Sequence, residues 1–336
     1  MGPGKATDRV RPAGMGDVAA VAGVSHQTVS RVLNGSPHVR EHTRERVLAA
    51  IAELDYRPNL AARALVTRRS GLLGVLATGL PHLGPASMLA GIETAARAAG
   101  FTALVGVLDD DEAQVGPILT SFAAHRVDGI AVIAPYPWLV EAARTASVGV
   151  PVLVVADADP GPGLARVGID QAGGARALVA HLVARGCTDI AHLSGPATWV
   201  DADLRVAGWR AAVTDAGLVP GRLLSGDWSA EAGHAAGRRL IAEGLPDAVF
   251  CGNDVMALGL LSALASAGVS VPGDVSVAGY DDMLGAAYLS PPLTTVRQPF
   301  TPVGARAVAV LLAAVGGGPC EQVTIQPELV IRASTR

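Results

Sequence analysis

From residue 72 onward, short apolar runs typical of β-strands alternate with longer Ala-rich stretches typical of helices. The runs are LLGVLA (72–77), FTALVGVL (101–108), GIAVIA (129–134), PVLVVA (151–156), DIAHLSG (189–195), AVFCGND (248–254) and VSVAGYDD (275–282). Continuous apolar strands separated by helices are typical of parallel sheets buried on both faces. These runs are too many for one ordinary sheet, so we expect an α/β core over residues 72–336, made of two doubly wound lobes.

The composition agrees with this interpretation. Half of the residues are hydrophobic but only 4% are aromatic, which favours Ala, Val and Leu packing over an all-β sandwich. A membrane span is not expected, because no apolar run approaches the required length, and the first residues do not resemble a secretory signal. The cysteines are few, odd in number and widely spaced, which fits a reduced compartment without a zinc site. We therefore expect a cytoplasmic protein with neither a metal nor a cofactor and no membrane partner.

The first 70 residues differ from the rest in charge. They hold 11 Lys and Arg against 6 Asp and Glu, whereas the other 266 residues hold 15 against 24. A basic segment joined to an acidic body favours a nucleic-acid partner, although a basic tail without a partner would give the same count.

Three short helices are predicted within residues 17–56, after a disordered tail over residues 1–16. The expected caps are Asp17 before the first helix, Gly23 after it and Ser25 before the second, which spans 26–33. The third helix is expected from about Thr43 to Leu54. Its apolar residues are Val47, Leu48, Ile51 and Leu54. Short helices joined by a tight Gly turn predict a helix-turn-helix DNA-binding domain.

The second of these helices has two distinct faces. Val29, Val32 and Leu33 fall on one side, and the other carries only polar residues without a carboxylate: His26, Gln27, Ser30, Arg31 and Asn34. A helix in the major groove needs such a face, because Gln pairs with adenine and Arg with guanine, while short polar groups contact phosphates. The alternative interpretation is a solvated helix face that lacks acidic residues by chance.

Several motifs together resemble the LacI/GalR family of bacterial transcription regulators, over about residues 16–334. They are DVAAVAG (17–23), VSHQTVSRVLN (24–34), GDWSAEAG (226–233), GNDVMALG (252–259), SVAGYDD (276–282) and PPLTTVRQPF (291–300). The resemblance implies a helix-turn-helix domain followed by a two-lobed core similar to periplasmic binding proteins. It is closer to the branch that responds to galactosides than to the purine or ribose branches.

The resemblance also implies which residues contact operator double-stranded DNA. Those expected to contact bases are His26, Gln27 and Arg31. Those expected to contact or support the phosphate backbone are Ser25, Thr28, Ser30, Asn34, His38 and Thr43. That branch carries an aromatic residue where this chain has His26, which predicts a different operator sequence. Residues 57–71 are expected to be a linker that forms a hinge helix on DNA, with Asn59, Ala62 and Leu65 near the minor groove.

A sugar site is expected in the cleft between the lobes, beyond the carboxyl ends of the strands. Arg205 offers a guanidinium fork for hydroxyls, Asn253 and Asp281 offer polar groups, and Trp228 and Phe300 offer apolar faces. The family match places these five around the effector. Further expected contacts are Thr78, Leu80, Pro85, Met88 and Gln298, the last also as a possible link between lobes. A strand-end Asp is alternatively a helix cap, and Trp228 alternatively ordinary packing.

One position departs from the family pattern. The related branch often has an Asp directly after the run VPVLVV, whereas this chain has Ala156 there and Asp157 one place later. Either Asp157 replaces that carboxylate or the corresponding hydroxyl is not bound.

The function predicted is a repressor, working as a homodimer, whose operator affinity is lowered by an inducer such as a galactoside or related sugar. Three alternatives stay open. The same family fold could serve a regulator that needs a corepressor. A sugar-binding protein without a DNA role could share the core. An enzyme is the third alternative, although the chain lacks the G-x-S-x-G, H-E-x-x-H and complete P-loop motifs.

Overall fold

A computed structural model describes residues 13–33, 36–56, 69–109, 111–146 and 148–336. The chain divides into two compact units, residues 1–70 and 71–336, which we describe separately. We call residues 13–56 the head and residues 71–336 the core. The predicted sites Asn34, Asn59, Ala62 and Leu65 lie outside the described residues, as do residues 1–12 of the predicted tail. No described helix is long and apolar enough to cross a membrane.

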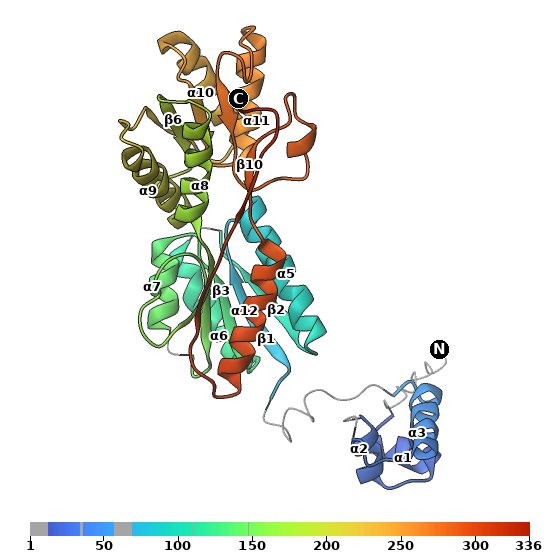
Figure 1. Cartoon of the computed structure of the whole chain (residues 1–336). Helices are drawn as coiled ribbons and strands as arrows, with labels where there is room; N and C mark the ends of the chain where they lie inside the picture. Colours follow the sequence, from blue (N-terminus) through green and yellow to red (C-terminus); the bar gives the residue numbers. More distant parts are fainter. Residues whose placement is uncertain (1–12, 34–35, 57–68, 110, 147) are drawn as a thin grey trace, which may run out of the picture. The chain divides into compact units, whose positions relative to one another are not determined.

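The head has the three helices that the sequence predicts. They are α1 (Met15–Ala22), α2 (His26–Leu33) and α3 (Glu41–Glu53) (Figure 1). Val29, Val32 and Val47 lie in their shared core, together with small residues of α1. Leu48, one of the apolar residues of the predicted third helix, does not belong to this core: its side chain is 51% exposed, because Val47 and Ala50 occupy the inward positions of α3.

Of the three caps predicted for the head helices, two are present and one is corrected. Helix α1 begins at Met15, three residues earlier than expected, so Asp17 is not its N-cap but accepts the backbone N–H of Gly14 at 2.7 Å. Gly23 ends α1 with a left-handed φ of 60°, as predicted. The Arg46 guanidinium donates to the Gly23 carbonyl, and its Nη2 lies 2.7 Å from where a Cβ on Gly23 would stand. Ser25 accepts the N–H of Thr28 at 3.2 Å, which confirms it as a cap.

The first lobe of the core contains a parallel sheet whose described strands have the order β11-β5-β4-β3-β1-β2. Their bounds are β1 Leu72–Ala77, β2 Thr102–Val107, β3 Gly129–Ile133, β4 Val152–Val155, β5 Ala165–Ile169 and β11 Gln322–Ile325. One face is covered by α5 (Leu83–Ala98) and α12 (Phe300–Val315), the other by α6 (Val115–Ala124) and α7 (Pro137–Thr145). A short turn, η1 (Glu112–Gln114), precedes α6. Apolar residues alternate between these faces, as expected for buried strands.

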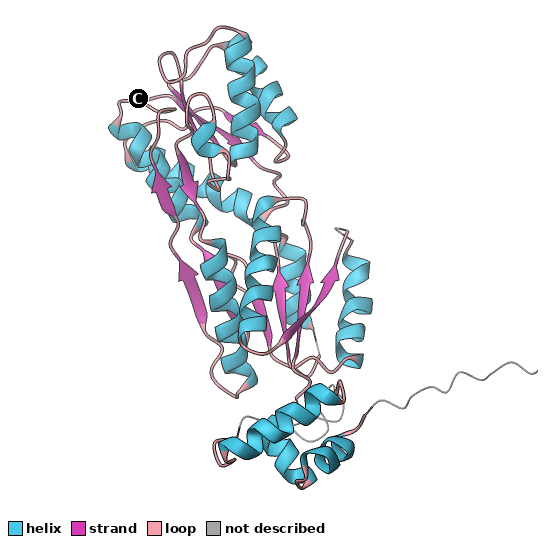
Figure 2. Ribbon diagram, turned by 90° about the vertical axis from the view of Figure 1, so that its right-hand side faces the viewer, coloured by secondary structure: helices cyan, strands magenta, loops and turns pink. Residues whose placement is uncertain are grey.

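The second lobe repeats this layered plan with a smaller parallel sheet, whose described strands have the order β7-β6-β8-β9. Their bounds are β6 Ile190–Ser194, β7 Leu223–Ser225, β8 Ala248–Cys251 and β9 Ser276–Ala278. The helices are α8 (Gln171–Ala184) and α9 (Val200–Asp215) on one face, and α10 (Ala230–Glu243) and α11 (Asp254–Ser266) on the other. The turn η2 (Ala286–Tyr288) follows β9. Figure 2 shows strands enclosed by helices in both lobes. These features confirm the predicted α/β class.

Within the described residues, the chain crosses between the lobes at three places. The crossings lie between β5 and α8, between β10 (Thr295–Arg297) and α12, and between β11 and β12 (Glu328–Val330), where β10 and β12 pair antiparallel. Helix α12 and strand β11 therefore return to the first lobe late in the sequence (Figure 1). Gln171 Nε2 donates to Gln298 Oε1 at 2.8 Å and thereby joins the first two crossings.

Candidate DNA-binding surface and ligand cavity

Helix α2 presents a polar face to solvent. His26, Gln27 and Arg31 are exposed, whereas Val29 and Val32 on the opposite side are buried. Helix α2 contains no acidic residue, so no carboxylate on it would repel a phosphate. The face therefore combines base-length donors and acceptors with an apolar side fixed to α1 and α3.

The remaining described residues expected at the DNA backbone surround this face. The Ser25 and Thr28 hydroxyls lie 2.9 Å apart at the start of α2, so each has a protein partner as well as partial access to solvent. Ser30 and Thr43 are partly buried and His38 is exposed. All three base-contact candidates are therefore exposed, as are Ser25 and His38 among the phosphate-contact candidates.

A cavity of about 230 Å³ lies between the two lobes of the core. The first lobe contributes Pro81–Pro85, and the second contributes the ends of its strands and helices. The lining residues from the second lobe and from the crossing after β10 are Trp199, Asp201, Arg205, Asp227, Trp228, Ser229, Asn253, Val255, Asp281 and Gln298. Its size suits a small ligand.

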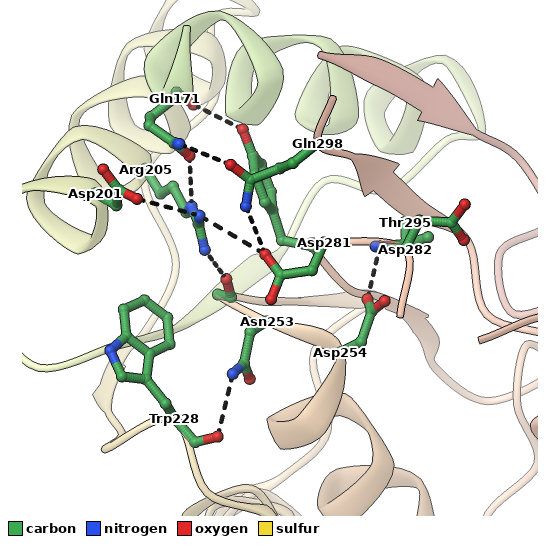
Figure 3. Close-up of polar contacts among 12 residues, drawn as sticks. Gln171, Asp201, Arg205, Trp228, Asn253, Asp254, Asp281, Asp282, Thr295 and Gln298 are labelled. Atoms are coloured by element: carbon green, nitrogen blue, oxygen red, sulfur yellow. Dashed lines mark hydrogen bonds and ion pairs between the residues drawn. The ribbon is translucent and has the colours of Figure 1, made fainter. Parts of the chain in front are cut away.

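Arg205, on α9, is the centre of a buried polar network (Figure 3). Its Nε donates to Gln171 Oε1 at 2.9 Å, and its Nη1 donates to the Gly252 carbonyl. Its guanidinium carbon also lies 3.9 Å from the centre of the Tyr280 ring. Gln171 is hydrogen-bonded to Gln298. The network therefore joins the cavity wall to the crossing between β5 and α8 and to the crossing between β10 and α12.

Asp281 completes this network at the end of β9. Its Oδ1 accepts the Nε2 donor of Gln298 at 2.6 Å. Burial raises the pKa of Asp281 to about 6, although Arg205 and the Gln298 hydrogen bond lower it. Asp281 also has a φ of 110°, a strained conformation for a residue with a Cβ.

Asn253 and Trp228 form the opposite part of the wall. Asn253 Oδ1 accepts the N–H of Met256 and so caps α11, while its Nδ2 donates to the Trp228 carbonyl at 3.1 Å. Asn253 is therefore both a helix cap and a support for the Trp228 loop. Trp228 has a φ of 72°, and its ring lies against Gly195, where a Cβ would be 2.1 Å from the indole.

The structure brings together six of the predicted ligand contacts. Those that line the cavity are Pro85, Arg205, Trp228, Asn253, Asp281 and Gln298. The other four do not line it. Met88 borders a smaller cavity of about 30 Å³ next to it. Thr78 is fully buried and donates to the Leu108 carbonyl at 3.1 Å. Leu80 and Phe300 pack in the apolar layer between α5, α12 and the sheet.

The sequence did not predict nine residues of the wall: Pro81, His82, Leu83, Gly84, Trp199, Asp201, Asp227, Ser229 and Val255. Trp199, at the start of α9, packs edge-on against Trp228 with ring centres 5.7 Å apart and against His82 of the first lobe at 5.0 Å. Asp201 follows in the first turn of α9. Trp199 is the N-cap of α9 and Asp201 lies in its first turn, where the sequence shows no helical periodicity, so only the position of Arg205 one turn later pointed towards them.

Asp157 does not reach the main cavity. Its Oδ1 accepts from Arg166 at 3.1 Å and its Oδ2 accepts the N–H of Gln171 at 3.0 Å. Both oxygens are thus occupied within the first lobe and its crossing, and Asp157 borders only the smaller cavity.

A helix-turn-helix head combined with a two-lobed core that encloses a small polar cavity defines a class: regulators that couple a DNA-binding module to a ligand-binding module. Residues 14–59 match the model for bacterial regulatory proteins of the lacI family, and residues 179–335 match a periplasmic binding protein-like domain. The described residues contain no cluster of side chains that could hold a metal ion.

Relatives of known identity extend the match to most of the chain. The lactose operon repressor of Escherichia coli K12 is 38% identical over 90% of this chain and 85% of its own length. The transcriptional repressor PurR of Vibrio campbellii is 35% identical over 95% and 98%. A crystal structure of the Lac repressor dimer bound to operator and the anti-inducer ONPF has a TM-score of 0.86 and 36% identity, covering 97% of this chain and 99% of that one. The chain belongs to the lacI family of bacterial regulatory proteins, and it is a regulator and not an enzyme.

Proposed function

We propose that this protein is a transcriptional repressor whose head binds operator DNA and whose cavity binds a small sugar that weakens this binding. The observation that carries the proposal is the exposed, acid-free polar face of α2, held on a packed three-helix head. The similarity to repressors, including one solved as a dimer on operator DNA, supports it.

In this proposal His26, Gln27 and Arg31 contact base edges in the major groove. Ser25, Thr28, Ser30, His38 and Thr43 contact or support the phosphate backbone. The protein acts as a homodimer on a near-palindromic operator, and it works in the cytoplasm, where such repressors meet DNA.

The ligand we propose is a galactoside or related sugar. Arg205 and Asp281 supply donors and acceptors for neighbouring hydroxyls, and Trp228 supplies an aromatic wall. The proposed coupling runs through Arg205, Gln171 and Gln298, because these bonded side chains connect the cavity with two crossings between the lobes. A sugar that prefers one arrangement of the lobes shifts the population towards it.

A gel-shift assay tests the proposal. The probes are DNA fragments from upstream of this gene and its neighbours, at low salt, with and without a panel of simple sugars. We expect one fragment to be bound specifically and one sugar to release it. Failure to bind any fragment would contradict the DNA-binding role, and tighter binding with a sugar would favour the corepressor mechanism instead.

A further inference from the structure

Asp201 is a cavity carboxylate with unused hydrogen-bonding capacity. Its side chain is 22% exposed and borders both the main cavity and the smaller one. Within the described part of the chain, no hydrogen bond reaches its oxygens, and its one ion pair is with Arg205. A partly buried carboxylate in this state lacks the donors that usually satisfy such a group.

The other carboxylates nearby are already engaged by the protein. Asp281 accepts from Gln298, and Asp227 accepts from both the backbone and the hydroxyl of Ser229. Asp157 has both oxygens occupied. Asp201 is therefore the carboxylate in this region that is best able to accept two donors from a ligand.

Arg205 lies between Asp201 and Asp281 without bonding directly to either. Its Nη2 is 3.9 Å from Asp201 Oδ2 and 3.8 Å from Asp281 Oδ1. Both distances exceed the usual range for hydrogen bonds to charged groups, about 2.7–2.9 Å. Figure 3 shows the three side chains converging from α9 and from the end of β9. A hydroxyl of a ligand can donate to a carboxylate and accept from the guanidinium in this arrangement.

The charge of the cavity restricts the ligand further. Its lining contains Asp201, Asp227 and Asp281 against one guanidinium, that of Arg205. Two of the five guanidinium N–H groups are already used by protein acceptors. An anionic ligand would add a negative charge to this excess and would find few free donors, whereas a neutral ligand rich in hydroxyls would find several acceptors.

We propose that Asp201 determines specificity: together with Arg205 and Asp281 it binds adjacent hydroxyls of an uncharged glycoside, and it excludes sugars that carry a carboxylate or phosphate. The Trp199 and Trp228 rings form the apolar wall on which such a glycoside lies. This inference rests on the proposed function for the presence of a sugar ligand, and it adds the residue and the chemical class.

Isothermal titration calorimetry on the full chain at neutral pH tests the proposal. The probes are methyl glycosides of glucose, galactose and mannose, the corresponding uronic acids and the 6-phosphates. We expect at least one neutral glycoside to bind, and its uronic acid and 6-phosphate to bind about 100-fold more weakly.

The variant Asp201→Asn keeps an acceptor but removes the charge. It should weaken the binding of the neutral glycoside about tenfold, because the charge-assisted hydrogen bond is lost. It should also reduce the difference in affinity between neutral and anionic sugars. The matched control is Asp203→Asn, an exposed position on the same helix that does not line the cavity. In this control the affinities for the neutral glycoside and for the anionic sugars should stay unchanged. Thermal melting of each variant checks that it is folded, and Asp201→Ser is a second variant at the same position.

Three results would overturn the inference: a uronic acid or phosphate that binds as tightly as its neutral glycoside, an unchanged selectivity in both Asp201 variants, or no binding of any neutral glycoside. The gel-shift assay separates this failure from that of the proposed function. Release of DNA by a uronic acid would refute the role of Asp201 and leave the repressor mechanism intact. Selective glycoside binding without any effect on DNA binding would refute the repressor mechanism and leave the role of Asp201 intact.

Discussion

In the head, the side chains proposed to contact bases project from α2 into solvent, whereas in the core, Arg205, Asn253 and Gln298 at the cavity are buried and hydrogen-bonded within the protein. Gln27 and Arg31 are exposed, but Arg205 is only 4% exposed. The difference teaches how mutations should act. A change on α2 should affect binding without affecting folding, while a change in the cavity network should affect both.

The largest effect is expected for Arg205→Ala. This change leaves the buried Asp281 carboxyl without its neighbouring cation and removes two hydrogen bonds from the network. We expect the response of DNA binding to sugar to disappear and the core to lose about 3 kcal/mol of stability. Urea unfolding and the gel-shift assay measure the two effects. A normal response to sugar would refute the assignment of the cavity.

The contrasting change in the head is Arg31→Ala. Loss of a base contact should weaken specific operator binding by about 2 kcal/mol and leave the stability and the sugar affinity unchanged. Arg40→Ala is the matched control, because it removes an exposed head cation that does not lie on α2. It should weaken specific and non-specific DNA binding by the same factor. If Arg31→Ala also weakened specific and non-specific DNA binding equally, Arg31 would contact only phosphate.

Two neighbouring residues of α3 test which face of this helix contributes to the stability of the head. Val47 is fully buried, whereas Leu48 is 51% exposed. Val47→Ala should destabilise the head by about 2 kcal/mol through loss of buried contacts, and Leu48→Ala should change its stability by less than about 0.5 kcal/mol. Circular dichroism of the unfolding transition of the head measures both. Equal losses would contradict the packing of α3.

The smallest expected effect is a dependence of the stability of the core on pH. Asp254 is fully buried, and this burial, aided by the charges of Asp281 and Asp282, raises its pKa to about 7 from 3.8. Thr295 and the Met283 N–H donate to it. A raised folded-state pKa favours the folded protein at low pH, and this advantage is lost as the pH rises through about 7.

The core should therefore lose about 1 kcal/mol of stability between about pH 6 and pH 7 on account of Asp254. Asp254→Asn should reduce this slope, and the contribution of Asp281, whose pKa is raised to about 6, should remain. Urea midpoints at the two pH values give the comparison. A slope that is unchanged in the variant would show that Asp254 titrates as an exposed carboxyl.

The fold was predictable where local pattern and tertiary environment agree. Each predicted apolar run contains a strand, because most of these strands are buried on both faces and leave a continuous apolar signal. Strand β2 is the exception: it lies at the edge of its sheet, and Val105 and Val107 are exposed. Strand β5 was missed since Arg166 and Gly168 interrupt it; Arg166 is tolerated there because it pairs with Asp157 and Thr324. Strands β7, β9, β10 and β12 each have three residues. Only β9 was predicted, because its apolar run extends beyond the strand.

The candidate site was predictable in part for the same reason. Asn253 and Asp281 stand out because polar residues follow apolar strands, whereas Arg205 was assigned from its guanidinium chemistry and from the family resemblance. Asp201 and Trp199 carry no such signal, since their importance depends on how α9 faces the first lobe. Thr78 was a reasonable candidate by position, but its hydroxyl is satisfied inside the lobe by the Leu108 carbonyl. Which polar groups are left free for a ligand is decided by tertiary hydrogen bonds.

Occupation of the cavity in the core is proposed to weaken the binding of the head to DNA. The most direct measurement is fluorescence anisotropy of a labelled operator fragment bound to the full chain, titrated with a neutral glycoside that calorimetry has shown to bind. We expect a fall in anisotropy that saturates with the occupancy of the cavity and is absent in Arg205→Ala. An anisotropy that stays constant while the cavity fills would contradict this proposal.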